Sequence, residues 1–183
     1  LMSLNDLGFN EAVSKQIEDA LASPNGMILC VGPTGSGKTT TLHSVIKKLN
    51  DGERKIITIE DPVEYVLEGI NQIQVHEQIG LTFSSLLKKI LRHDPDIIMV
   101  GEMRDYDTAK LAFSASLTGH LVLSTLHTNS CAATFKRLKD LGIDDYLIES
   151  TVKIIISQRL VRRLCQNCKR EIDTPEPFKE ISV

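Results

Sequence analysis

The sequence of 183 residues contains no tryptophan, and aromatic residues make up only 4% of it. Proteins that bind single-stranded nucleic acid stack its bases on aromatic side chains, so this scarcity disfavours that function. The charge balance has no strong excess of either sign, because 24 acidic residues face 21 basic ones and give a net charge of -3. A generally basic nucleic-acid binder is also disfavoured, and we expect no nucleic acid among the partners.

The sequence also lacks a long hydrophobic run, and no segment approaches the roughly 18 consecutive apolar residues of a membrane-spanning helix. Residues 1–10 lack the positive and apolar blocks of a signal peptide. The four cysteines, of which two are isolated and two form a Cys-x-x-Cys pair, are too few and too unevenly spaced for a secreted disulfide scaffold. We therefore expect a cytoplasmic protein, whose 42% hydrophobic residues suffice for one sizeable core.

The sequence does contain an alternation of short apolar runs with amphipathic segments. Continuous apolar runs are typical of strands that are buried on both faces, and we expect such strands at residues 27–31, 55–59, 97–100 and 121–124. Helical periodicity predicts helices after Asn10 and at residues 38–49, 83–91, 106–117, 130–141 and 145–157. Residues 64–75 are less regular, and we expect short strands there. This alternation indicates an α/β domain with a mostly parallel central sheet flanked by helices.

A glycine-rich segment joins the first predicted strand to the helix that follows it. Its pattern of Gly, four residues and Gly-Lys-Thr is typical of the phosphate-binding P-loop when it lies between a strand and a helix. Glycines let successive backbone N–H groups turn inward around a phosphate, and the helix adds the positive end of its dipole. The predicted nucleotide-binding residues are Gly32, Pro33, Thr34, Gly35, Ser36, Gly37, Lys38, Thr39 and Thr40. Lys38 would reach the β- and γ-phosphates of a nucleotide such as ATP or ADP.

Carboxylates follow two of the predicted strands. Glu102 follows the third strand and is predicted to order the water shell of Mg²⁺, so that the metal is held by the Thr39 hydroxyl directly and by Glu102 through water. Glu60, Asp61 and Glu64 follow the second strand. One of the three could polarise the attacking water, because carboxylates at the carboxyl edge of a parallel sheet face the bound phosphates. Spacing alone does not choose among them.

Two histidines bracket the fourth predicted strand, with His120 before it and His127 after it. Each of them alone is explained equally well as a buried structural residue. Together with Thr125 and Thr128 they are candidates for sensing the γ-phosphate, because imidazole and hydroxyl groups both donate hydrogen bonds to phosphate oxygens.

Four of these segments together resemble the motifs of one family. They are the P-loop, an acidic box at residues 59–65, a second box at residues 96–105 and a histidine box at residues 118–129. The combination resembles the C-terminal ATPase domain of the secretion ATPase superfamily, specifically the type II secretion and type IV pilus assembly ATPases, over nearly all of residues 4–169. The resemblance implies a RecA-like P-loop NTPase fold and a hexameric ring with nucleotide sites near the subunit boundaries.

The resemblance also implies roles for individual residues. Glu64 matches the family's catalytic glutamate that activates water, Glu102 the glutamate on the metal side, and His127 the histidine that couples the γ-phosphate to neighbouring elements. Together with Lys38 they form the expected catalytic set. The stretch at residues 158–165 resembles the extension and secretion branch of the family more than the retraction branch.

We expect two regions in the chain, a RecA-like core over residues 1–158 and a basic tail over residues 159–183. The tail carries Cys165 and Cys168, and in this branch of the family such a pair is half of a four-thiolate Zn²⁺ site. Since no second pair follows, the tail resembles a truncated zinc-binding subdomain, and we do not expect bound Zn²⁺. The family's N-terminal domain, whose linker supplies arginines to the phosphates, is expected to be absent.

Several basic side chains are open to two interpretations. Those of the tail are either solvated or contact a membrane surface or a platform protein. Their positions are Arg159, Arg162, Arg163, Lys169 and Arg170. Arg104, which follows the metal-side glutamate, either adds charge to the nucleotide site or forms an ion pair with Asp105 or Asp107.

The resemblance implies an ATPase that converts ATP to ADP and phosphate in a homohexamer and powers type II secretion or type IV pilus assembly at the cytoplasmic face of the inner membrane. The implied partners are an inner-membrane platform protein and cytoplasmic adaptor proteins, so membrane association would be peripheral. Two alternatives stay open. One is a nucleotide-binding scaffold with little turnover, which the missing arginines favour. The other is a DNA-translocating relative of the conjugation and uptake ATPases, which the net charge of -3 disfavours.

Overall fold

The computed structural model describes residues 2–165 and 167–170. Within them one sheet has the strand order β3-β2-β4-β5-β1-β6. Its strands are β1 (Gly26–Val31), β2 (Ile56–Glu60), β3 (Asn71–Gln74), β4 (Ile97–Val100), β5 (Leu121–Leu126) and β6 (Val152–Ser157). Each pair of neighbouring strands runs parallel, so the predicted mostly parallel sheet is confirmed.

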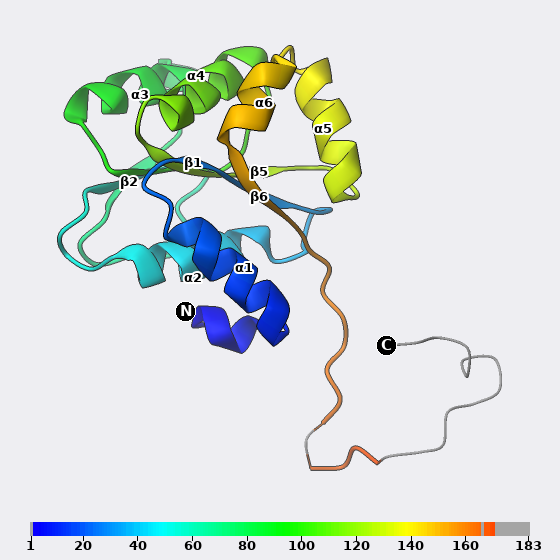
Figure 1. Cartoon of the computed structure of the whole chain (residues 1–183). Helices are drawn as coiled ribbons and strands as arrows, with labels where there is room; N and C mark the ends of the chain where they lie inside the picture. Colours follow the sequence, from blue (N-terminus) through cyan, green and yellow to red (C-terminus); the bar gives the residue numbers. More distant parts are fainter. Residues whose placement is uncertain (1, 166, 171–183) are drawn as a thin grey trace.

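Helices cover both faces of the sheet, as Figure 1 shows. The helices are α1 (Glu11–Leu21), α2 (Lys38–Leu49), α3 (Phe83–Ile90), α4 (Tyr106–Leu117), α5 (Cys131–Asp140) and α6 (Asp145–Thr151). Helices α1 and α2 pack on one face, and α3, α4, α5 and α6 lie on the other. Short 3-10 turns occur at Leu4–Leu7, Glu77–Ile79 and Leu91–His93. The predicted α/β architecture with flanking helices is thus confirmed.

Strand β1 is buried along its whole length because both of its faces are covered. Met27 and Leu29 belong to the core cluster that includes α3 and α4, whereas Ile28 and Cys30 belong to the cluster that includes α1 and α2. Successive side chains of a strand point to opposite faces, so a strand between two helical layers needs apolar residues at every position. The continuous apolar run of the sequence is explained by this double burial.

Side-chain caps fix where several helices begin. The Asn10 side chain accepts a hydrogen bond from the backbone N–H of Val13 at 2.9 Å, as its position before α1 predicts. The Asp105 carboxylate accepts one from the backbone N–H of Thr108 at 2.8 Å at the start of α4. Such a cap satisfies a backbone donor that has no partner inside the helix. The Asp105 carboxylate therefore caps α4, and this contact weakens the interpretation in which it forms an ion pair with Arg104.

One predicted helix is wrong in its second half. The sequence pattern predicts a helix over residues 145–157, but α6 ends at Thr151 and the chain continues directly into strand β6. The segment after Thr151 is rich in β-branched residues, which favour a pleated strand, and β1 offers it a free edge to pair with. In the irregular residues 64–75 the structure has the single strand β3.

Because the strands are parallel, their carboxyl ends meet at one edge of the sheet. The P-loop leaves the end of β1, Glu60 ends β2, Glu102 follows β4 and His127 follows β5. Ligands of open α/β sheets bind outside this edge. In the part of the chain that the structure describes, no helix combines the length and the apolar character that crossing a bilayer requires.

Leu29→Ala should lower the free energy of unfolding by about 2 to 5 kcal/mol, because deletion of a buried leucine side chain leaves a cavity. Leu29 is 0% exposed in the centre of β1. Val66→Ala is the matched control, since Val66 is 91% exposed, and we expect it to change the free energy by no more than about 0.5 kcal/mol. Urea denaturation followed by circular dichroism measures both, and equal losses would contradict the burial of β1.

Candidate functional site

The P-loop connects the end of β1 to the first turn of α2. Gly35 and Gly37 have φ angles of 76° and 86°, which glycine adopts without steric cost. Gly32 is restricted by close packing, because a Cβ atom on it would lie 2.6 Å from the carbonyl oxygen of Gln158. The glycine pattern therefore has local causes in backbone conformation and in the space that the loop occupies. A loop of this shape presents backbone N–H groups to an anion at the start of a helix.

Lys38 is the first residue of α2, and its side chain folds back over the loop. The Nζ atom donates hydrogen bonds to the carbonyl oxygens of Gly32 and Pro33, each at 3.0 Å. Lys38 is only 8% exposed, and burial lowers the pKa of its ammonium group. Among the described residues, Ser36 Oγ is one of the few buried side-chain atoms without a hydrogen-bond partner. A buried cation and an unpaired hydroxyl in one glycine-rich loop fit a phosphate group.

The segment that follows β6 packs against the P-loop, although its sequence carries no signal that places it in the site. Thr41 Oγ1, on α2, donates to Gln158 Oε1 at 2.7 Å. Arg159 Nη2 donates to the carbonyl oxygen of Asn129 at 2.7 Å, and Leu160 lines the pocket above the loop. Strand 152–157 pairs in parallel with β1, so the residues that follow it lie at the same sheet edge as the P-loop. Prediction of this strand from its β-branched residues would have placed them there.

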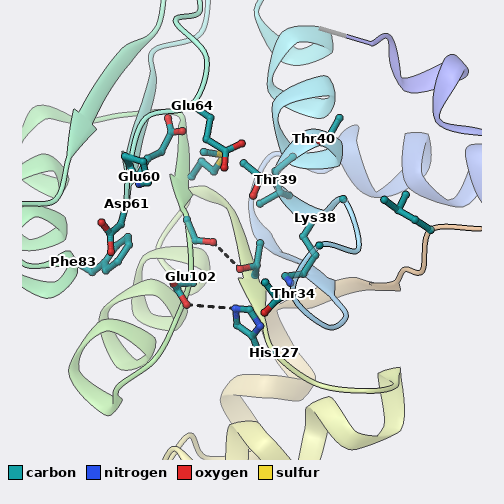
Figure 2. A pocket seen from close by; sticks show the side chains of 18 residues that line it. Thr34, Lys38, Thr39, Thr40, Glu60, Asp61, Glu64, Phe83, Glu102 and His127 are labelled. Atoms are coloured by element: carbon teal, nitrogen blue, oxygen red, sulfur yellow. Dashed lines mark hydrogen bonds and ion pairs between the residues drawn. The ribbon is translucent and has the colours of Figure 1, made fainter.

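Glu102 lies between the side chains of Arg104 and His127. Its carboxylate pairs with the guanidinium of Arg104, and its Oε2 atom lies 3.6 Å from His127 Nε2. Figure 2 shows the contact between Glu102 and His127 as a dashed line. Arg104 also lies 4.0 Å from a carboxylate oxygen of Asp61. Of the two interpretations of Arg104, the structure favours charge in the site, since its ion pairs are with Glu102 and Asp61 rather than with the acidic residues that follow it.

Glu60 is held by three hydrogen bonds at the end of β2. Its carboxylate accepts from Thr58 Oγ1 at 2.6 Å and from Gln72 Nε2 at 2.9 Å, and it lies 2.8 Å from His43 Nε2. Burial raises the pKa of Glu60, but these hydrogen bonds outweigh that effect and leave the pKa below its ordinary value of 4.5. Glu64 is exposed and lines the same pocket. Of these two carboxylates, Glu64 is therefore the one whose oxygens face the open pocket.

The two histidines lie at opposite ends of β5. His120 precedes the strand, and its Nδ1 atom lies 3.1 Å from the carbonyl oxygen of Ala115, far from the P-loop edge. The hypothesis that His120 senses a phosphate is therefore wrong. His127 follows the strand, is 51% exposed and lines the pocket.

The two threonines of the histidine box also differ in position. Thr125 lines the pocket, and its Oγ1 atom donates to the carbonyl oxygen of Gly101 at 2.7 Å. Thr128 is buried, with its Oγ1 atom 2.7 Å from Thr134 Oγ1 in the first turn of α5. Thr128 thus belongs to the packing of that helix, and its hypothetical role as a phosphate sensor has no support in the structure.

A pocket of 430 Å³ joins these elements. Figure 2 shows Glu64, Glu102 and His127 facing the P-loop helix across it. Of the predicted nucleotide-binding residues, those that line it are Thr34, Gly35, Gly37, Lys38, Thr39 and Thr40. Six further lining residues were not among the predicted site residues: Leu42, Pro62, Phe83, Met99, Gly101 and Leu160. The Thr39 hydroxyl and the Glu102 carboxylate in one pocket are oxygen ligands of the kind that Mg²⁺ prefers.

The cysteine pair lies outside this pocket. Cys165 and Cys168 are exposed free thiols, and hydrogen bonds from the backbone of Asn167 and from Cys168 lower the pKa of Cys165. Within residues 2–165 and 167–170 no group of three or more histidine, cysteine or acidic side chains is arranged to hold a metal ion. Most of the predicted tail, residues 171–183, lies outside the described residues.

The fold and the site define a class of protein. An all-parallel sheet carries a P-loop between β1 and α2, and carboxylates follow the neighbouring strands β2 and β4 at the same edge. This is the RecA-like class of P-loop NTPases, as the sequence predicts.

The comparisons with known proteins define the family. The chain matches the family described as Type II/IV secretion system protein over residues 1–182, and it belongs to that family. It is 53% identical over 178 residues to type II secretion system protein E of Xanthomonas campestris pv. campestris, with coverage of 97% of this chain and 31% of that protein. It is 50% identical over 169 residues to the type IV pilus assembly ATPase PilB of Myxococcus xanthus, with coverage of 92% and 30%.

A solved structure of the pilus retraction motor PilT with bound ADP is also similar. It has a TM-score of 0.79 and 40% sequence identity, with coverage of 88% of this chain and 49% of that chain. The chain spans about a third of the length of the two curated relatives. The predicted family and the predicted fold class are both confirmed.

The buried Glu60 carboxylate should make stability depend on pH in the acid range. A carboxyl group whose pKa is lowered by folding stabilises the folded state above its unfolded pKa, and this contribution is lost as the pH falls through its folded pKa. Glu60→Gln should therefore be less stable than the wild type at pH 7 by about 1 to 3 kcal/mol. The difference should narrow between about pH 5 and about pH 3.

Urea denaturation at several pH values measures this difference. Glu68→Gln is the control, because Glu68 is exposed on the loop that follows β2, and it should be close to the wild type at each pH. A gap between Glu60→Gln and the wild type that stays constant from pH 7 to about pH 3 would show that the Glu60 charge does not carry the effect.

Proposed function

We propose that this chain is the ATP-hydrolysing motor domain of a machine for type II secretion or type IV pilus assembly. The observation that carries the proposal is the single pocket in which the P-loop residues Lys38 and Thr39 meet Glu64, Glu102 and His127. Four motifs of the sequence contribute to it: the P-loop supplies Lys38 and Thr39, and the acidic box, the second box and the histidine box supply one residue each. The names of the relatives, which include a secretion system protein and a pilus assembly ATPase, support the same function.

The pocket suits transfer of the γ-phosphoryl group of ATP to water. Lys38 and the backbone of the P-loop bind the phosphates, and this chain's Thr39 and Glu102 would hold Mg²⁺ between them. Mg²⁺ bound there would neutralise charge on the phosphate oxygens. Glu64 accepts a proton from the attacking water and orients it, since its carboxylate faces the open pocket. His127 lies 3.6 Å from Glu102 and directly follows β5. By contacting the γ-phosphate it couples the presence of that phosphate to the position of β5 and of the loop after it.

The assembly that this proposal implies is a homohexamer at the cytoplasmic face of the inner membrane. Its partners are an inner-membrane platform protein and cytoplasmic adaptors, through which the ring associates peripherally with the membrane. Residues 1–158 form the RecA-like core in this proposal, and residues 159–183 form the basic tail that carries half of a cysteine cluster. Hydrolysis releases the side chains that the γ-phosphate had drawn together, and this release is the source of movement.

Glu64→Gln should bind ATP as the wild type does but should lower turnover by at least about 100-fold, because an amide cannot take the proton from water. Titration calorimetry measures the binding, and phosphate release measures the turnover. Lys38→Ala is the control that loses nucleotide binding. Glu68→Gln, on the same loop, should keep both binding and turnover, since Glu68 is exposed. Normal turnover in Glu64→Gln would refute the role of Glu64.

Turnover per chain should rise steeply with protein concentration as hexamers form, because sites near subunit boundaries are completed by the neighbouring subunit. ATP turnover with Mg²⁺ and light scattering, measured over the same concentration series, test this expectation. Tight nucleotide binding without turnover at any concentration would instead favour the nucleotide-dependent scaffold. Turnover that rises on addition of DNA would favour the DNA-translocating alternative.

A further inference from the structure

A chain of polar contacts connects the P-loop helix to the loop that carries Glu64. His43, on α2, is 0% exposed, and its Nε2 atom lies 2.8 Å from Glu60 Oε2. Because an ionised carboxylate only accepts hydrogen bonds, His43 Nε2 is the donor of this contact. Its Nδ1 atom is buried and, in the part of the chain described by the structure, has no partner. His43 therefore makes its one polar side-chain contact with Glu60.

Gln72, on β3, continues this chain of contacts to the loop. Its Nε2 atom donates to Glu60 Oε1 at 2.9 Å and to the carbonyl oxygen of Tyr65 at 2.9 Å. Its Oε1 atom accepts from the backbone N–H of Leu67 at 2.6 Å. Both amide hydrogens and the amide oxygen are thus used, and two of the three bonds go to the backbone just after Glu64.

Two further contacts hold the same stretch of the loop. The backbone N–H of Val63 donates to Gln74 Oε1 at 3.4 Å. The ring of Tyr65 meets the ring of His43 edge to face, with 5.7 Å between the centroids and 89° between the planes. Glu64 therefore lies between neighbours that are each fastened to the sheet or to the P-loop helix. Its side chain is exposed, but its backbone is held on both sides.

We infer that Gln72 is a positioning residue for ATP cleavage, because its carboxamide clamps the backbone of residues 65–67 to Glu60 and so holds Glu64 at a fixed place opposite the P-loop. The inference rests on the proposed function, in which Glu64 acts on the attacking water. Loss of the clamp leaves the P-loop intact but lets Glu64 move, and a displacement of about 1 Å at a reacting group lowers a rate by roughly 100-fold.

Gln72→Met tests the clamp, because methionine keeps the length of the side chain and removes its amide. We expect kcat to fall by roughly 10- to 100-fold, while the Kd for ATP changes by less than about threefold. Hydrogen exchange at the Leu67 amide should become faster, since its acceptor is gone. Circular dichroism and thermal unfolding show that the variant is folded.

Asn71→Ala is the matched control, because Asn71 is the preceding residue of β3, is exposed and points to the opposite face of the sheet. It should leave kcat, Kd and the exchange of the Leu67 amide unchanged. The double variant Gln72→Met with Glu64→Gln separates positioning from general weakening of the fold. If Gln72 acts through Glu64, adding Gln72→Met should cause no further loss of single-turnover rate in the Glu64→Gln protein.

Two failures are distinguishable in this design. A wild-type protein that binds ATP and never cleaves it would overturn the proposed function, whatever Gln72 does. A wild-type protein that cleaves ATP, with a Gln72→Met variant of equal kcat, would overturn the positioning role and leave the proposed function standing. The positioning role would also fail if Gln72→Met raised the Kd in proportion to its loss of rate, or if the losses were additive in the double variant.

Discussion

The site depends on the placement of β1 between β5 and β6. Hydrogen bonding on both edges and helices on both faces leave this strand no freedom to shift, so the P-loop leaves the sheet at a fixed point. Because the neighbouring strands run parallel, the side chains at their carboxyl ends meet at that point. The parallel pairing of the strands therefore brings Glu102 and His127 to the P-loop, although they lie far from it in the sequence.

Three glutamates lie at one edge of the sheet, and differences in their burial and in their contacts give each of them a different chemical role. Glu60 is buried and its carboxylate oxygens accept three hydrogen bonds from the protein, so its role is structural. The charge of Glu102 is balanced by Arg104, and its second oxygen faces His127, an arrangement that suits a carboxylate next to a metal and its water. Glu64 is exposed to the pocket and is the one suited to receive a proton.

The sequence predicted most of the fold and the local part of the site. The phosphate-binding role of residues 32–39 was predictable because a P-loop is one continuous segment, and its glycines are required by the local backbone conformation. The strand Val152–Ser157 was missed because it follows a helix without a turn, and only its pairing with β1 distinguishes it from a continued helix. Sequence position alone did not separate His120 from His127, which the strand direction does, and the contacts of Gln72 depend on the register of β3 on β2.

The fastening of the loop after β2 has a consequence for how its length can vary. Exposed loops ordinarily tolerate insertions and deletions. Here the backbone N–H groups of Val63 and Leu67 donate hydrogen bonds to side chains of β3. A residue inserted between them would move one of these N–H groups away from its acceptor, and that hydrogen bond would be lost. The turn at Gly69 lies beyond these bonds and is exposed. Changes in length should therefore be confined to the few residues around that turn, and the stretch that holds Glu64 should keep a constant length although it faces solvent.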